Sequence, residues 1–289
     1  MAFAALSGDE QRILFTKLCN VLEPRLAVYL SSASNDLREP TQALVQQLRA
    51  DHEVAAALCR KLGLRSCKEL REAKHVDWYN KGLTTADFAT LGSLGSVLPA
   101  LEVLCLCERS AGPDAVQRLA ERLGAGALPV VTSLSFLNTH VGDAGASALA
   151  AALGRGALPR LERLWLFDAS IGDAGLVALA PALRLRTALE RLGLGSNPLR
   201  DEGLFALLAP PPTAGAPPPP TGALMKLKWL DLNSTQVSDA GCAALAAALG
   251  SGALPALQTL FIGGTPASVA ARVAVHEAIA TSREPRVPI

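Results

Sequence analysis

The sequence predicts an α/β solenoid, in which short parallel strands line one side of a curved chain and helices line the other. Two observations predict it. An apolar segment of the form LPxLxxLxL recurs six times, mostly at intervals of about thirty residues. After most copies comes a GDAG-like word, followed by apolar residues at helical spacing. One strand and one helix in each repeat is the simplest fold that satisfies both periods.

The first half of each repeat predicts a strand, because its leucines alternate with other residues along LxxLxL. One interval is longer than the rest, and a proline-rich insertion at 210–222 accounts for it. We expect this insertion to be a loop at the solenoid edge whose deletion leaves the fold intact. The six segments are 98–106, 128–136, 158–166, 187–194, 224–232 and 254–262.

The second half of each repeat predicts a helix. In one copy, Ala146, Leu149, Ala150 and Leu153 stand at i, i+3, i+4 and i+7, which is one helical face. The GDAG word is expected to start this helix. Its aspartates would cap the helix N-terminus, and its second glycine would let neighbouring repeats approach closely. The aspartates are Asp143, Asp173 and Asp239, and the glycines are Gly145, Gly175 and Gly241.

The pattern LxxLxLxxx followed by GDAGxxxLAxAL resembles the ribonuclease-inhibitor-like class of leucine-rich repeat, from about Leu98 to Ala280. The resemblance implies a horseshoe with parallel strands on the concave side and helices on the convex side. It also implies that function is binding at the concave face rather than chemistry.

Side chains alternate across a strand, so the residues between the leucines are expected to face the concave surface. Aromatic and charged residues gather there, and Trp and Arg are enriched at binding hot spots. We expect Gly193 and Gly195 to leave a dip between the two tryptophans. The candidate protein-binding residues are Arg163, Trp165, Phe167, Arg191, Trp229, Asp231 and Phe261.

Residues 1–97 contain no LxxLxL unit, and their pattern is helical. They are expected to form an α-helical cap over the open end of the solenoid, while residues 98–289 hold the six repeats. Within 82–99, Thr84 or Thr85 is placed to cap a helix, with Asp87 in its first turn.

Residues 6–41 also resemble an F-box motif, with Leu6 and Glu10 at the start, although Ser7 stands where the usual Pro would be. An F-box followed by leucine-rich repeats is similar to the substrate receptor of a cullin-type ubiquitin ligase. That resemblance implies a Skp-type adaptor as partner of this segment. A Ran-type GTPase-activating protein is a further alternative, because such activators are built from the same repeat class.

Composition narrows the other classes of function. The formal net charge is +1, which gives no general reason to expect nucleic acid or a membrane as partner. Six cysteines, with no signal peptide and no long apolar run, favour an intracellular protein of cytoplasm or nucleus. Cys105 and Cys107 lack further ligands at metal-binding spacing. No phosphate loop, nucleophile elbow or HExxH helix is present, so we expect a non-enzymatic protein without cofactor or metal.

Overall fold

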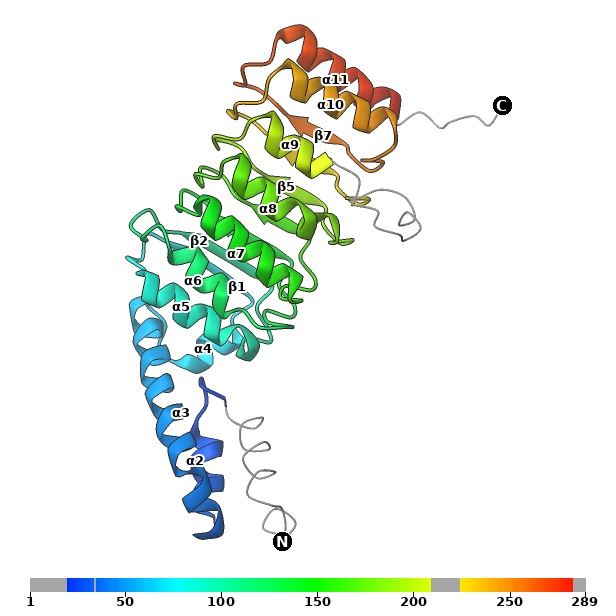
Figure 1. Ribbon diagram of the computed structural model, residues 1–289. Coiled ribbons are helices and arrows are strands. Elements are labelled where there is room, and N and C mark those ends of the chain that lie inside the picture. The colour runs from blue at the N-terminus through cyan, green and yellow to red at the C-terminus, as the bar shows by residue number, and fades with distance from the viewer. Residues whose placement is uncertain (1–19, 34, 209–223, 283–289) are drawn as a thin grey trace, which may run out of the picture.

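The computed structural model describes residues 20–33, 35–208 and 224–282. It shows an open, curved solenoid in which one parallel sheet lines one side and a row of helices the other (Figure 1). The sheet has seven strands in sequence order, from β1 to β7. The strands are β1 His75–Tyr79, β2 Val103–Cys107, β3 Ser133–Phe136, β4 Arg163–Trp165, β5 Arg191–Gly193, β6 Trp229–Asp231 and β7 Thr259–Phe261.

Helices follow the strands in alternation, and within the described residues three helices precede the first strand. This alternation explains why the strands are parallel. Each helix carries the chain back to the end of the sheet at which the previous strand began, so the next strand runs in the same direction. The helices are α2 Arg25–Ser32, α3 Asn35–Lys61, α4 Cys67–Glu72, α5 Thr85–Leu94, α6 Ala115–Arg122, α7 Gly142–Gly154, α8 Asp173–Arg184, α9 Asp201–Leu208, α10 Asp239–Gly250 and α11 Val269–Ser282, with the 3-10 turn η2 at Gly95–Val97.

The core lies between the sheet and the helices. One leucine of each repeat pairs in register with its counterpart in the next strand, and all six are buried. The α/β solenoid predicted from the leucine pattern is therefore confirmed. The residues of this buried column are Leu104, Leu134, Leu164, Leu192, Leu230 and Leu260.

The range 1–97, which is expected to form an α-helical cap, also contains a strand. Strand β1 lies in this range and pairs in parallel with β2. Val76 stands opposite Leu104 and Trp78 opposite Leu106, and both are buried like the leucines. The sheet thus begins one strand earlier than the leucine pattern indicates. Helix α5 follows β1, and Thr84 forms the predicted cap with Asp87 in a capping box.

The N-terminal helices divide into two parts. Leu58 of α3, Leu62 just after α3 and Leu70 of α4 join the core of the solenoid. Helix α2 and the middle of α3 share a separate small apolar cluster and extend beyond the sheet (Figure 1). Of the F-box-like segment 6–41, residues 6–19 and 34 lie outside the described residues, and the rest spans α2 and the start of α3.

The aspartates of the GDAG word do not cap their own helices, so that prediction is wrong. Each carboxylate instead accepts a backbone N–H at the start of the next helix along the chain. The negative charge still lies near helix N-termini, where the helix dipole favours it. The bonds run from Gly172 to Asp143, Gly203 to Asp173, Ser238 to Asp201 and Ser268 to Asp239, at 2.7, 2.9, 2.8 and 2.5 Å.

These aspartate bonds between repeats, which we call the Asp relay, explain why the second glycine of the GDAG word is needed. A Cβ atom at Gly175 would lie 2.5 Å from Oδ1 of Asp143, and Gly241 is equally close to Asp201. The predicted close approach of repeats is confirmed at these two positions. Pro113 stands at the aspartate position of the preceding repeat, so Gly145 receives no carboxylate. The recurring word therefore joins successive repeats to each other.

Candidate functional site

Four aromatic side chains meet on the concave face, and we call Trp165, Phe167, Trp229 and Phe261 the aromatic cluster. Trp165 stacks on Phe167 with ring centroids 5.8 Å apart, and it meets Trp229 edge-on at 4.8 Å. Trp229 lies 5.3 Å from Phe261. These rings come from β4, β6, β7 and the residue two beyond β4, so the contact runs across four strands of the sheet.

The rings meet across β5 because glycines stand at its last residue and two residues beyond it. A Cβ atom at Gly193 would lie 2.6 Å from the Phe167 ring and 2.7 Å from Trp165. One at Gly195 would lie 3.1 Å from Phe167. The expected dip between the tryptophans is therefore filled by the side chains that lean over from β4. The glycines make room for one continuous aromatic surface.

The aromatic cluster is partly open to solvent. Phe261 is 41% exposed, and the other three rings are half-buried. Their columns lie on the opposite side of the sheet from the buried leucines, since Trp165 stands in register with Ser135 and Gly193. The alternation of LxxLxL thus places these aromatic side chains on the side away from the helices.

Two arginines border the aromatic cluster. Arg163 of β4 and Arg191 of β5 are direct neighbours in register, and Arg191 pairs in turn with Trp229. Arg191 is exposed, whereas Arg163 is half-buried. The Nη2 of Arg163 donates to Oγ1 of Thr132 at 3.2 Å, but its buried Nε has no acceptor among the described residues.

Asp231 differs from the expected open position, because it is only 8% exposed. Its Oδ1 accepts a hydrogen bond from the Asn233 amide at 2.7 Å and lies close to Gly195. The carboxylate therefore lies between the backbone of Asn233 and Gly195. Burial raises the pKa of Asp231, and the single bond from the Asn233 backbone only partly offsets this.

The first three strands carry a different surface. Asp77, Cys105 and Ser135 stand in register in the same row as Trp165 and Asp231. Burial, together with the nearby charge of Asp77, raises the pKa of the Cys105 thiol to about 11. A thiol held protonated in this way is a poor nucleophile and metal ligand.

Within the described ranges, no group of three or more His, Cys, Asp or Glu side chains could hold a metal ion. None of the helices in those ranges has the length and apolar character needed to cross a bilayer.

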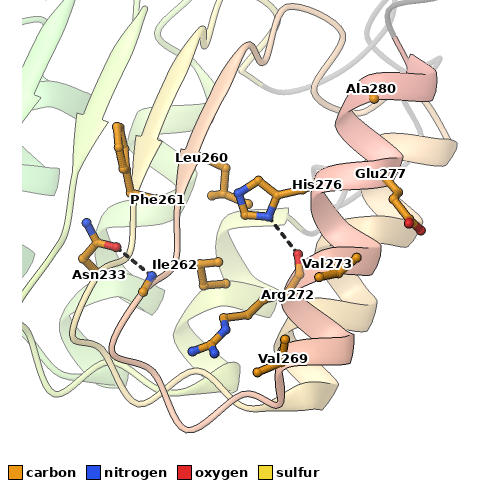
Figure 2. A pocket seen from close by; sticks show the side chains of 11 residues that line it. Asn233, Leu260, Phe261, Ile262, Val269, Arg272, Val273, His276, Glu277 and Ala280 are labelled. Atoms are coloured by element: carbon orange, nitrogen blue, oxygen red, sulfur yellow. Dashed lines mark hydrogen bonds between the residues drawn. The ribbon is translucent and has the colours of Figure 1, made fainter.

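The structure also shows a groove that sequence reasoning missed. It has a volume of about 660 Å³ and lies between β7, the last strand of the sheet, and α11. In Figure 2, Leu260 and Ile262 point from β7 toward the helix, while Phe261 stands on the other side of the strand. Val269 and Val273 of α11 are exposed beside it. The missing GDAG word of the last repeat is the one sequence signal for an open end.

With this geometry, the fold is that of a leucine-rich repeat solenoid. A family model described as "Leucine Rich repeat" matches residues 187–208 and 223–246. No curated protein sequence matches the chain.

Among solved structures, the chain is similar to leiomodin-1 actin-binding site 2, with 13% identity and a TM-score of 0.39, over 59% of this chain and 86% of that one. It is also similar to the C-terminal domain of tropomodulin from Caenorhabditis elegans, with 13% identity and a TM-score of 0.39, over 69% of this chain and 93% of that one. A TDR receptor shows 17% identity and a TM-score of 0.31, over 62% of this chain and 24% of the receptor. Similarities this low carry no inference about what this chain binds.

Proposed function

We propose that this chain is a non-enzymatic protein-binding module that holds another protein on its concave face. The observation that carries the proposal is the aromatic cluster, which forms one partly exposed apolar surface bordered by Arg163 and Arg191. Contiguous apolar surface rimmed by polar groups marks interaction sites. Trp and Arg are also the residue types that contribute most at interfaces. Asp231, whose Oδ1 lies close to Gly195, is the seventh residue of the proposed site.

Packing alone does not account for these rings. Strands β2 and β3 form the same sheet with Val103, Ser133 and Ser135 in the equivalent columns. The repeats fold with small side chains in these columns, so the stability of the solenoid does not require aromatic residues on this face. Gly193 and Gly195, which leave room for the rings, indicate that the aromatic surface is not a by-product of packing in the solenoid.

The test is affinity capture of the tagged full chain from its native cells, with quantitative mass spectrometry. The same capture is run with Trp165→Ala/Trp229→Ala and with the matched control Ser133→Ala/Ser135→Ala. We expect specific partners to be lost with the tryptophan variant and kept with the serine variant. Circular dichroism checks that both variants are folded. If the tryptophan variant captures the same proteins as the wild type, the proposal is wrong.

The two alternatives have their own readouts. If residues 6–41 act as an F-box, the capture recovers a Skp-type adaptor and a cullin, and the aromatic cluster becomes a substrate site. If the chain activates a Ran-type GTPase, it stimulates GTP hydrolysis in a purified assay. No specific contact among the described residues favours either alternative.

A further inference from the structure

We infer that the segment held at the aromatic cluster is acidic, and that it presents a carboxylate to Arg163 and Arg191 beside an apolar side chain on Trp229. The inference rests on the proposed function, because it names the chemistry of the partner at that same site. Three features of the described residues carry it.

The first feature is the placement of two like charges. Arg163 and Arg191 stand directly opposite each other on neighbouring strands, which lie about 4.8 Å apart. Like charges in this position destabilise a sheet. Within the described ranges, neither arginine forms an ion pair. Glu190, next to Arg191 in the chain, is bound to Nζ of Lys228 at 2.8 Å. A bound anion would remove the repulsion that the fold leaves in place.

The second feature is the unused hydrogen-bonding capacity of Arg163. A guanidinium carries five N–H donors in a planar fork that matches a carboxylate. Only the bond to Thr132 engages Arg163, and its buried Nε has no acceptor in the described structure. The guanidinium as a whole is half-buried, so its remaining N–H groups can bind a carboxylate, and charge-assisted bonds of this kind are stronger than neutral ones.

The third feature is the position of Trp229, which pairs in register with Arg191 and contacts both Trp165 and Phe261. The charged and apolar surfaces therefore adjoin on one face. In an extended segment, residues i and i+2 point to the same side. Such a segment can place an acidic side chain on the arginines and an apolar one on the rings.

The experiment uses a displayed library of random peptides, selected on the immobilised full chain and counter-selected on Trp229→Ala. We expect peptides that combine Asp or Glu with an aromatic or branched apolar residue. Replacing their Asp and Glu by Asn and Gln should weaken binding by about tenfold or more. Arg163→Gln and Arg191→Gln should have a similar effect and reduce the dependence on salt. Arg160→Gln, an exposed arginine before β4, is the matched control.

Two results would overturn the inference. Peptides that require Trp229 but are neutral or basic, and that bind Arg163→Gln normally, would refute the acidic partner and leave the proposed function standing. A single-stranded oligonucleotide retained through both arginines and Trp229 would replace the acidic peptide with nucleic acid. In contrast, a library with no peptide dependent on Trp229 would count against the proposed function itself.

Discussion

The two halves of the concave face share one scaffold and differ in what they display. In strands β2 and β3 the columns that face away from the helices carry small residues such as Val103, Cys105 and Ser133, whereas β1 carries His75, Asp77 and Tyr79 there. In strands β4 to β7 the same columns carry arginines and the aromatic cluster. The buried leucine column continues through both halves with each leucine 5% exposed or less.

This difference distinguishes the residues that stabilise the fold, which face the helices, from those of the proposed site, which face away from them. Hydrophobic burial acts on one face of each strand, and backbone hydrogen bonds join each strand to its neighbours in the plane of the sheet. Both recur from repeat to repeat. The outer columns contribute little to that burial, so they can vary between repeats. The concentration of Trp and Arg in one half is therefore a feature of the proposed site and not a requirement of the scaffold.

The largest expected effect tests whether the scaffold is shared. Leu134→Ala in β3 and Leu192→Ala in β5 remove fully buried side chains from equivalent positions, one in each half. Each should lower the free energy of unfolding by about 2–5 kcal/mol, because the lost methyl groups leave a cavity. Urea denaturation followed by circular dichroism measures both. A loss confined to one variant would break the comparison, because the halves would then be stabilised differently.

Much of this fold could be predicted from the sequence, because leucine at fixed spacing determines both the strand and its buried face. Strand β1 could not, because Val76 and Trp78 replace the leucines and one short alternation is a weak signal. The bonds from each aspartate to the next helix also could not be predicted from the repeat pattern. Asp143 shows that a carboxylate is wanted near a helix start, but the sequence does not say which helix it reaches.

The next largest effect concerns the buried polar groups that join the repeats. Asn197 accepts two backbone N–H bonds and donates to three backbone carbonyls. In the first half, the Thr139 hydroxyl lies in the loop after β3, where it accepts one bond from the backbone N–H of Glu108 at 2.9 Å and has one proton to donate to the carbonyls of Leu106 and Leu137. We expect Asn197→Ala to cost about 3 kcal/mol and Thr139→Ala about 1 kcal/mol, since an asparagine leaves more groups unsatisfied.

Thermal unfolding of the two variants measures this difference. Asn197→Asp is a useful companion, because it keeps the accepting oxygens and loses the donors. Equal losses for Asn197→Ala and Thr139→Ala would mean that water replaces the asparagine, and that both halves tolerate an open loop equally.

The candidate site itself was only partly predictable. Alternation along each strand identified the columns, because that requires no knowledge of side-chain conformation. The contact of Trp165 with Trp229 across Gly193 depends on rings leaning over a neighbouring strand, which no spacing encodes. The burial of Asp231 likewise depends on side-chain conformation. The pairing of Arg163 with Arg191, in contrast, follows from alignment of the repeats, which puts both residues in one column of successive strands.

The next prediction compares one substitution from each half, Trp229→Ala and Ser135→Ala, by their effects on stability and on partner binding. Trp229→Ala removes ring contacts with Trp165, Phe167 and Phe261, which should cost about 1–2 kcal/mol. The variant should remain folded and lose captured partners. Ser135→Ala, at a buried hydroxyl in the first half, should change stability by about 0.5 kcal/mol or less and keep the partners. If Trp229→Ala unfolds the chain, the rings belong to the core and the comparison fails.

The smallest effect compares two buried carboxyl groups, one in each half. Burial opposes the ionisation of Glu108, but hydrogen bonds from Ser110 and from the Leu83 amide outweigh it and lower its pKa. A lowered pKa in the folded state stabilises the protein above the unfolded pKa, and this stability is lost as pH falls. Asp231 has the opposite sign, because burial raises its pKa. Its favourable contribution is present below the unfolded pKa and is lost as pH rises through the folded one.

The two isosteric amides should therefore change stability in opposite directions at pH 7. Asp231→Asn should raise the free energy of unfolding by a few tenths to about 1 kcal/mol, since the neutral amide avoids the cost of a buried charge and its oxygen can still accept from Asn233. Glu108→Gln should lower it. Urea titrations at pH 7 and near pH 3 measure both, and each difference should shrink at the lower pH, where the wild-type carboxyls take up protons. Should Asp231→Asn destabilise the chain at pH 7, the ionised carboxylate has a partner that compensates its burial, and an acidic group in this half serves the scaffold as Glu108 does in the other.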